Sequence, residues 1–248
     1  MRALRKLIFV QIKLFLREPP AFFFTLIFPA LLLILFGAIF GNTPDPQQHA
    51  TLGYIDYEVP GLAAVIIATV GLMSIPIAVA GEREKQILRR YRATPLRPSI
   101  YLAATNCVYF GMALLGMLIL IVVAKVFFGL RFEGNWLSVL GGFTLSALAF
   151  FSVGYVVASI SPTSRVAQVI GQLAFFPMMF LSGAAFPTQI MPENVRRVSE
   201  ALPLTYVVRL LQGLWSGDSL GRHLPEIGIL VAMLLVGMLV SSWTFRWE

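Results

Sequence analysis

Residue types that perform acid–base, nucleophilic or metal chemistry are scarce in this chain. Its 248 residues include 12 Asp and Glu, 2 His and 1 Cys. No H-E-x-x-H or G-x-x-x-x-G-K-[ST] pattern occurs, His49 and His223 are far apart, and Cys107 has no second cysteine as a partner. The sequence therefore predicts no catalytic residue, no metal site and no cofactor bound by the chain itself, and we do not expect it to be an enzyme.

The densest group of charges follows directly on an apolar run, in the segment 82–99. Helical spacing places apolar side chains on one side of this segment and basic ones around them. An apolar cluster with a charged rim is typical of a docking surface, where the carboxylates would pair with basic residues of a partner. A basic anchor on anionic lipid is the alternative. The residues that carry this interpretation are Glu82, Arg83, Glu84, Ile87, Leu88, Arg89 and Tyr91.

These charges are embedded in a chain with the composition of a membrane protein. Hydrophobic residues make up 58% of it and charged residues 12%, far from the proportions of a soluble domain. A helix needs about 20 apolar residues to cross the hydrocarbon core. Six runs are long enough, and they leave no room for a nucleotide-binding domain. They predict six transmembrane helices in a single domain over 1–248, at about 22–41, 61–81, 100–128, 137–160, 166–186 and 227–245.

Basic residues predict the orientation of these spans. With the N-terminus in the cytosol, 13 of the 19 Lys and Arg residues fall on the cytosolic side and 6 on the external side. Basic residues near span ends are retained in the cytosol, so we expect both termini there. The net charge of +7 then matches anionic lipid headgroups, and nucleic acid is not an expected partner.

Residues 1–20 are predicted to form an amphipathic helix at the membrane interface. One face of the helix is apolar, although Gln11 interrupts it, and basic residues lie on the opposite face. The basic residues assigned to this interfacial helix are Arg5, Lys6, Lys13 and Arg17. At the other side of the membrane, the segment 187–226 is predicted to be external, with a helix start near Pro192 and an apolar stretch too short to span.

By these boundaries no span contains Asp, Glu, Arg or His in its interior, and Asp56 and Glu58 belong to the first external loop. Ion-coupled carriers usually need intramembrane ionisable groups, so that class is disfavoured. Polar and aromatic side chains within the spans serve packing or line a substrate path. The candidates for such a path are Asn106, Gln168, Gln172, Phe175 and Phe176.

Prolines and small residues inside the spans predict bends and close contacts. Pro29, Pro76 and Pro177 remove a backbone hydrogen bond and kink a helix. Small residues four apart permit close approach of two helices, but this spacing does not choose an interface. The pairs are Gly37 and Gly41, Gly154 and Ala158, Ala167 and Gly171, and Gly237 and Ser241.

Three passages resemble a known family, the ABC-2 type transporter permeases, and particularly the bacterial drug-resistance exporter branch. Residues 54–62 are similar to the stretch leading into the family's second span, and residues 82–96, which include Pro95, resemble its cytosolic coupling segment. Residues 186–206 resemble the external region before the last span. Gln86 departs from the family, which commonly has glycine at this position. The departure leaves docking of the segment plausible, but it puts the family's local backbone conformation in question.

The resemblance implies an all-α integral membrane fold with an N-terminal surface helix, six spans, a cytosolic coupling helix and short external helices before the last span. It also implies a permease in the bacterial inner membrane, paired with a second copy or a relative and docked on two cytosolic ATP-binding subunits that would hold ATP and Mg²⁺. An amphiphilic or lipophilic cargo is expected. Export of a polysaccharide or lipid-linked polymer is the alternative, and a channel, an ion-coupled carrier or a membrane anchor are rival classes.

Overall fold

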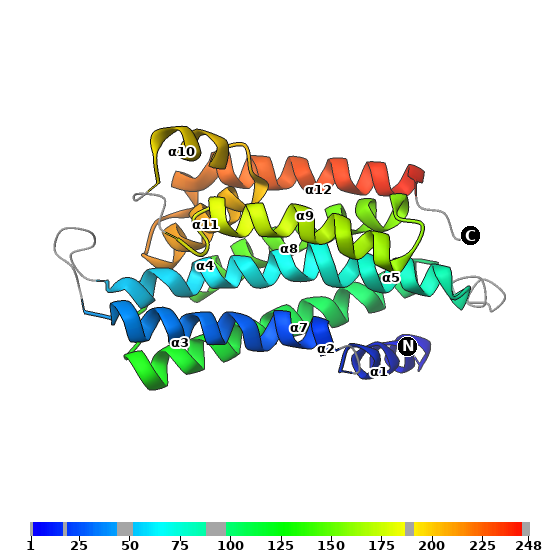
Figure 1. The fold of residues 1–248 in the computed structure, drawn as a ribbon, viewed down its shortest axis with the longest axis horizontal. Coiled ribbons are helices and arrows are strands. Elements are labelled where there is room, and N and C mark those ends of the chain that lie inside the picture. Colours follow the sequence, from blue (N-terminus) through cyan, green and yellow to red (C-terminus); the bar gives the residue numbers. More distant parts are fainter. Residues whose placement is uncertain (1, 17–18, 44–51, 88–97, 187–190, 245–248) are drawn as a thin grey trace.

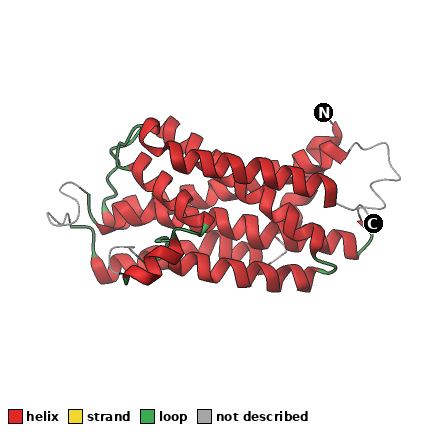
Figure 2. Ribbon diagram, turned by 90° about the horizontal axis from the view of Figure 1, so that it is seen from above, coloured by secondary structure: helices red, strands yellow, loops and turns green. Residues whose placement is uncertain are grey.

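The computed structural model describes residues 2–16, 19–43, 52–87, 98–186 and 191–244. All regular structure in these ranges is helical, which confirms the all-α fold expected from the sequence. Long helices lie side by side in an elongated bundle (Figure 1, Figure 2). In chain order they are α1 (Arg2–Leu16), α2 (Pro19–Phe22), η1 (Phe23–Ile27), α3 (Phe28–Phe40), α4 (Tyr54–Thr69), η2 (Val70–Ser74), α5 (Ile75–Glu84), α7 (Pro98–Phe128), α8 (Trp136–Ile160), α9 (Ser164–Leu181), α10 (Glu193–Ser199), α11 (Pro203–Trp215), η4 (Leu220–His223) and α12 (Leu224–Thr244).

Six of the described helical stretches are long and apolar enough to cross a membrane. The second of them, which joins α4, η2 and α5 without a break, is the most deeply buried and forms the centre of the bundle. The others surround it and expose many large apolar side chains, as lipid-facing helices do. The six stretches are Phe23–Phe40, Tyr54–Glu84, Ile100–Phe128, Trp136–Ile160, Ser164–Leu181 and Leu220–Thr244.

The central helix begins earlier than the sequence analysis expected, at Tyr54 instead of Gly61. The assignment of Asp56 and Glu58 to an external loop is therefore wrong, because both lie in the first turns of α4 and are only 0% and 3% exposed. Two acids are thus buried in a predicted span. The statement that the span interiors lack acidic residues does not hold, and it no longer counts against an ion-coupled carrier.

Asp56 is buried because its carboxylate ties three segments together at this end of the bundle. One oxygen accepts hydrogen bonds from the Asn42 Nδ2 at 2.9 Å and from the Arg131 backbone N–H at 2.8 Å, and the other accepts from the Gly53 N–H at 2.9 Å. Asn42 also binds the Phe128 carbonyl at 3.0 Å. A buried carboxylate is stable when backbone donors surround it. Here it connects the ends of α3 and α7 to the start of α4.

Two predicted kink prolines each follow a π-helical turn. Pro29 comes after η1 and Pro76 after η2, and neither can donate to the carbonyl four residues before it. For Pro76 that carbonyl belongs to Leu72, and Gly171 of α9 lies directly against it: a Cβ on Gly171 would stand 2.2 Å from the Leu72 oxygen. Gly154 of α8 meets the Gly71 carbonyl at the same distance. The small residues thus bring α8 and α9 onto the π turn of the central helix.

We expect Gly154→Ala to lower the free energy of unfolding by about 1–3 kcal/mol, because its Cβ would overlap a backbone oxygen that cannot move aside easily. Gly141→Ala is the matched control on the same helix, since a Cβ there meets nothing within 4 Å. The control should be neutral or slightly stabilising. The apparent melting temperature of each purified variant checks this, and equal values would show that α8 does not approach the π turn so closely.

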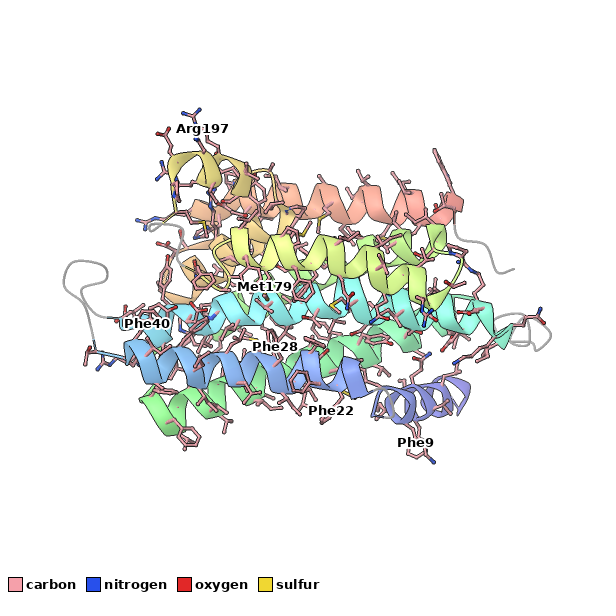
Figure 3. The ribbon with its side chains drawn as sticks, in the orientation of Figure 1. Phe9, Phe22, Phe28, Phe40, Met179 and Arg197 are labelled. Carbon is pink, nitrogen blue, oxygen red and sulfur yellow. The ribbon has the colours of Figure 1, made fainter. Side chains whose placement is uncertain are left out.

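The N-terminal helix α1 lies beside α7, across its axis at one end of the bundle (Figure 1). Its buried side chains recur four apart, at Leu7, Gln11 and Phe15, as an amphipathic helix requires. Phe9 is 68% exposed and points away from the bundle (Figure 3), and Lys13 is exposed as well. Arg5 and Lys6 belong to α1, although their side chains lie outside the description, and Arg17 lies outside the described residues.

At the opposite end, the apolar stretch expected between the fifth and sixth spans forms α11. One face of this helix is strongly apolar, and it packs among α4, α8 and α12 with Trp215 completely buried. The short helix α10 lies outside it, and Arg197 points outward there (Figure 3). The short helices therefore close one end of the bundle, and α1 and the last turn of α12 lie at the other (Figure 1).

Candidate functional site

The charged group that ends the central helix makes contacts with several helices at once. Glu82 is 9% exposed and accepts hydrogen bonds from the Tyr101 hydroxyl at 2.6 Å and from the Gln11 amide at 3.4 Å. Gln11 also donates to the Thr105 hydroxyl at 3.4 Å. The 2.6 Å bond from the Tyr101 hydroxyl is the stronger contact, because short hydrogen bonds to a carboxylate are strong when they are buried. Glu82 therefore connects α5 to both α7 and α1.

Arg83 reaches in another direction, to the last turn of α8. Its guanidinium donates to the Ser159 carbonyl at 3.4 Å and to the Ser161 carbonyl, and Ser161 is the residue that ends the helix. The last carbonyls of a helix have no partner within the helix and carry partial negative charge. A guanidinium there satisfies two of them and holds the end of α8 against α5.

Glu84 makes the complementary contact with the start of α9. Its Oε2 accepts from the Ser164 backbone N–H and from the Ser164 hydroxyl, both at 3.0 Å. The first N–H groups of a helix carry partial positive charge, which favours a carboxylate. Glu84 is exposed, so this contact contributes less than that of Glu82.

Three consecutive residues thus bind four other helices: α1 and α7 through Glu82, α8 through Arg83, and α9 through Glu84. Successive side chains on a helix point about 100° apart, and this spread lets each residue reach a different neighbour. We call Glu82, Arg83 and Glu84 the three-residue joint. The expectation that the Glu82 carboxylate faces the basic residues of a partner is wrong, because that carboxylate is buried inside the chain.

After the joint the helix ends in a turn at Lys85 and Gln86. Gln86 has a φ of 57°, the left-handed region, and is the one non-glycine residue with a positive φ among the described residues. This region costs a side-chain-bearing residue roughly 1–2 kcal/mol, and glycine much less. The position where the sequence departs from the family's glycine is therefore one where the backbone itself favours glycine.

The predicted docking segment is described only in part. Ile87 is half-buried and, with Gln11, Phe15 and Glu82, lines a cavity of about 200 Å³ between α1 and α5. Leu88, Arg89, Tyr91 and Pro95 lie outside the described residues, so their role stays a prediction.

The residues predicted to line a substrate path do not meet at one place. Asn106 faces a cavity between α7, α8 and α12, and its Oδ1 accepts from the Tyr155 hydroxyl at 3.0 Å. On α9, Phe175 is completely buried, whereas Phe176 is 39% exposed. Gln168 is exposed and Gln172 half-buried on that same outer side of α9. None of these α9 residues lines the Asn106 cavity.

Sequence reasoning missed the partners of the joint: Gln11, Tyr101, Thr105 and the serines at the ends of α8 and α9. One signal was present. Gln11 interrupts an otherwise apolar face, and a polar residue on a buried face needs a polar partner. Gln11 is 71 positions from Glu82 and 94 positions from Thr105 in the chain, and no local pattern relates these residues.

His223 lies in η4 and lines a cavity of about 280 Å³. Its Nε2 is 3.4 Å from an Asp218 oxygen and its Nδ1 is 3.7 Å from a Glu226 oxygen. Arg222 hydrogen-bonds Asp218 at 2.6 Å and thereby holds the pKa of this carboxyl below its usual range. These contacts join the turn after α11 to the first turn of α12. His49 lies outside the described residues.

Comparison with known proteins shows a family match and several similar proteins. The family described as "ABC-2 type transporter" matches residues 2–214 of this chain. The "Probable multidrug ABC transporter permease YbhS" of Escherichia coli (strain K12) is 25% identical over 192 residues, which are 77% of this chain and 50% of that protein. "Nodulation protein J" of Rhizobium leguminosarum bv. viciae is 30% identical over 115 residues, 45% of this chain and 44% of that protein. The chain spans about half the length of these curated relatives.

Proposed function

This chain belongs to the ABC-2 type transporter family, and on that premise we propose that it is the permease subunit of an exporter driven by a separate ATP-binding subunit. ATP and Mg²⁺ would bind to that partner in the cytosol, and the permease would bind none itself. The three-residue joint is the observation that supports the mechanism. It forms the beginning of the predicted docking segment 82–99, and it binds four other helices.

The proposed mechanism is mechanical. Closure of the ATP-binding subunits would push on the segment 82–96 and on α1. Because Glu82 binds α1 and α7 directly, and Arg83 and Glu84 bind the ends of α8 and α9, a displacement at the docking segment would move all four helices together. Exposed ion pairs contribute only about 0–1 kcal/mol each, so apolar contacts should supply most of the affinity for the partner.

We further propose a dimer of permeases in the bacterial inner membrane, with both termini cytosolic, that exports an amphiphilic or lipophilic cargo. The outer side of α9 leaves Leu173 and Phe180 exposed at 72% and 45%, and this face is available to a second copy. The printed name of the Escherichia coli relative includes the word multidrug, which favours a lipophilic cargo over a polymer.

A reconstituted complex tests the proposal. The chain is purified with its candidate ATP-binding subunit in lipid nanodiscs, and the ATPase rate is compared with that of the subunit alone. Arg89→Glu, in the predicted docking segment, should weaken the association about tenfold by reversing charge at the contact. Arg197→Glu is the matched control, because this exposed arginine lies at the other end of the bundle (Figure 3).

Association that depends on Arg89 and not on Arg197 supports both the permease role and the orientation. Dependence on Arg197 instead would reverse the orientation. If the two proteins do not associate in any lipid composition, the proposed function is wrong, and a channel or an ion-coupled carrier becomes the better candidate.

A further inference from the structure

A cavity of about 570 Å³ lies between α7, α8 and α12. Its floor is on α8, where Phe151 and Tyr155 are 1% and 8% exposed. Its rim carries Leu148 and Met238, which are 38% and 57% exposed, so the cavity opens to the outside of the bundle. Packing defects in protein interiors rarely exceed the size of a water molecule, whereas ligand sites span about 300–1,000 Å³. The volume is that of a binding site.

The lining of the cavity defines what it accepts. None of the described residues that line it is charged, and most are apolar. The hydroxyls of Ser152 and Ser241 donate to carbonyls of their own helices, at 2.7 Å and 3.1 Å, so their lone pairs remain as acceptors. The Asn106 oxygen already accepts from Tyr155, and the Asn106 NH₂ group provides two further donors. An uncharged apolar molecule with one hydroxyl or carbonyl group matches this set, whereas an ion would leave its charge unpaired.

The position of the cavity defines the route of entry. Asn106 lies near the start of α7, and Tyr155 and Ser241 lie near the ends of α8 and α12. These helix ends are at the same end of the bundle as α1 and the three-residue joint (Figure 1). In the proposed orientation this is the cytosolic half of the membrane, and the rim of the cavity faces lipid. A lipophilic molecule dissolved in the inner leaflet would reach the site without crossing water.

We propose that the cavity between α7, α8 and α12 binds an uncharged lipophilic molecule that carries a hydroxyl or carbonyl group and enters sideways from the inner leaflet. This inference rests on the proposed exporter function for its biological purpose, but the binding itself does not require the partner. The cavity is also coupled to the joint, because α7 and α8 both carry groups bound by Glu82 and Arg83.

Photolabelling with a diazirine derivative of octanol, an uncharged alcohol, tests the proposal on the chain alone in nanodiscs. We expect saturable adducts on α7, α8 and α12 around Asn106, Tyr155 and Ser241, which excess unlabelled octanol removes. Labelling of lipid-facing residues far from the cavity, such as Val126 near the other end of α7, should rise in proportion to the probe concentration. Adducts that appear without saturation at all positions would overturn the inference.

Two variants show whether the cavity is the site. Leu148→Trp fills the rim and should lower the saturable labelling about tenfold, whereas Leu140→Trp is the matched control because Leu140 is a 45% exposed leucine of α8 that does not line the cavity. Asn106→Leu keeps the volume but removes the donors, and should lower labelling about fivefold. Equal effects of the two tryptophan variants would contradict the proposal.

A small lipophilic molecule and a membrane lipid both have an apolar body, so either could occupy the cavity. A second labelling experiment distinguishes between them. The same labelling is repeated with a phosphatidylcholine that carries the diazirine on an acyl chain. If this lipid labels the cavity and octanol does not displace it, the site belongs to a membrane lipid and the inference is wrong. The photolabelling contains no ATP-binding subunit, so its failure does not affect the proposed permease function. If instead the chain fails to associate with an ATP-binding subunit, the photolabelling result remains valid.

Discussion

If the chain is the proposed permease, replacing Glu82 by alanine is expected to lower ATP-driven transport tenfold or more, although Glu82 is buried inside the chain. The substitution removes the acceptor of the Tyr101 hydroxyl, at 2.6 Å, and of the Gln11 amide, at 3.4 Å. Hydrogen bonds to a charged group contribute about 1.5–3 kcal/mol, and about 1.4 kcal/mol corresponds to tenfold in an equilibrium. α1 and α7 would then no longer follow the movement of α5. Transport into inverted vesicles and the partner's ATPase rate measure the effect.

Two further substitutions make this prediction specific. Glu82→Gln keeps an oxygen that can accept from Tyr101, so it should retain an intermediate transport rate. Glu84→Ala removes an exposed carboxylate at the start of α9, and it should reduce transport less than Glu82→Ala. ATPase activity should persist in all three, because the proposed complex carries its nucleotide site on the partner. Equal loss for Glu82→Ala and Glu84→Ala would show that the two glutamates act as surface charges, as the sequence first suggested.

The sequence predicts the six long helices well because hydropathy is a property of single residues summed over about 20 positions. It places the start of the central helix seven residues late, since Asp56 and Glu58 look like loop residues by composition. What makes Asp56 a helix residue is a set of donors from Asn42, Gly53 and Arg131, and the last of these is 75 positions away. No window along the chain can contain that information.

The same limit explains the candidate site. The group Glu82 to Glu84 stands out in the sequence as a cluster of charge, and its role in coupling stays a prediction. The direction in which each of these side chains points could not be predicted from the sequence, because it depends on which helix end lies beside the side chain. The path candidates show the opposite failure: Phe175 and Phe176 are adjacent in sequence and alike in chemistry, yet one is buried in the bundle and the other faces outward.

The central helix is held near both of its ends by a buried carboxylate, Asp56 at one end and Glu82 at the other. Asp56 and Glu82 lie 26 positions apart, which is about 39 Å along a helix. Between them the π turn η2 interrupts the regular hydrogen bonding at Pro76, and Gly154 and Gly171 of the neighbouring helices pack against it. Because the Asp56 carboxylate ties the ends of α3 and α7 to the start of α4, we expect the Asp56 end to serve as a fixed anchor.

This view predicts that Asp56→Ala chiefly destabilises the chain. The three donors that face the carboxylate would lose their acceptor in a place that is 0% exposed, and each such loss costs about 1 kcal/mol or more. We expect a fall of about 3 kcal/mol in the free energy of unfolding and a fall of roughly 10 °C in the apparent melting temperature. The purified variant's thermal transition in detergent measures both changes.

Glu133→Ala is the matched control, because this acid lies at the same end of the bundle but is exposed, and its removal should change the melting temperature by less than about 1 °C. Asp56→Asn should fall between the two, since one of its oxygens is replaced by a donor that faces other donors. If Asp56→Ala melts like the control yet transports poorly, the anchor interpretation fails and the buried carboxylate takes part in transport itself. If it melts early but its remaining folded fraction stimulates the partner's ATPase normally, the two ends of the central helix have separate roles: one end holds the bundle together and the other transmits the movement.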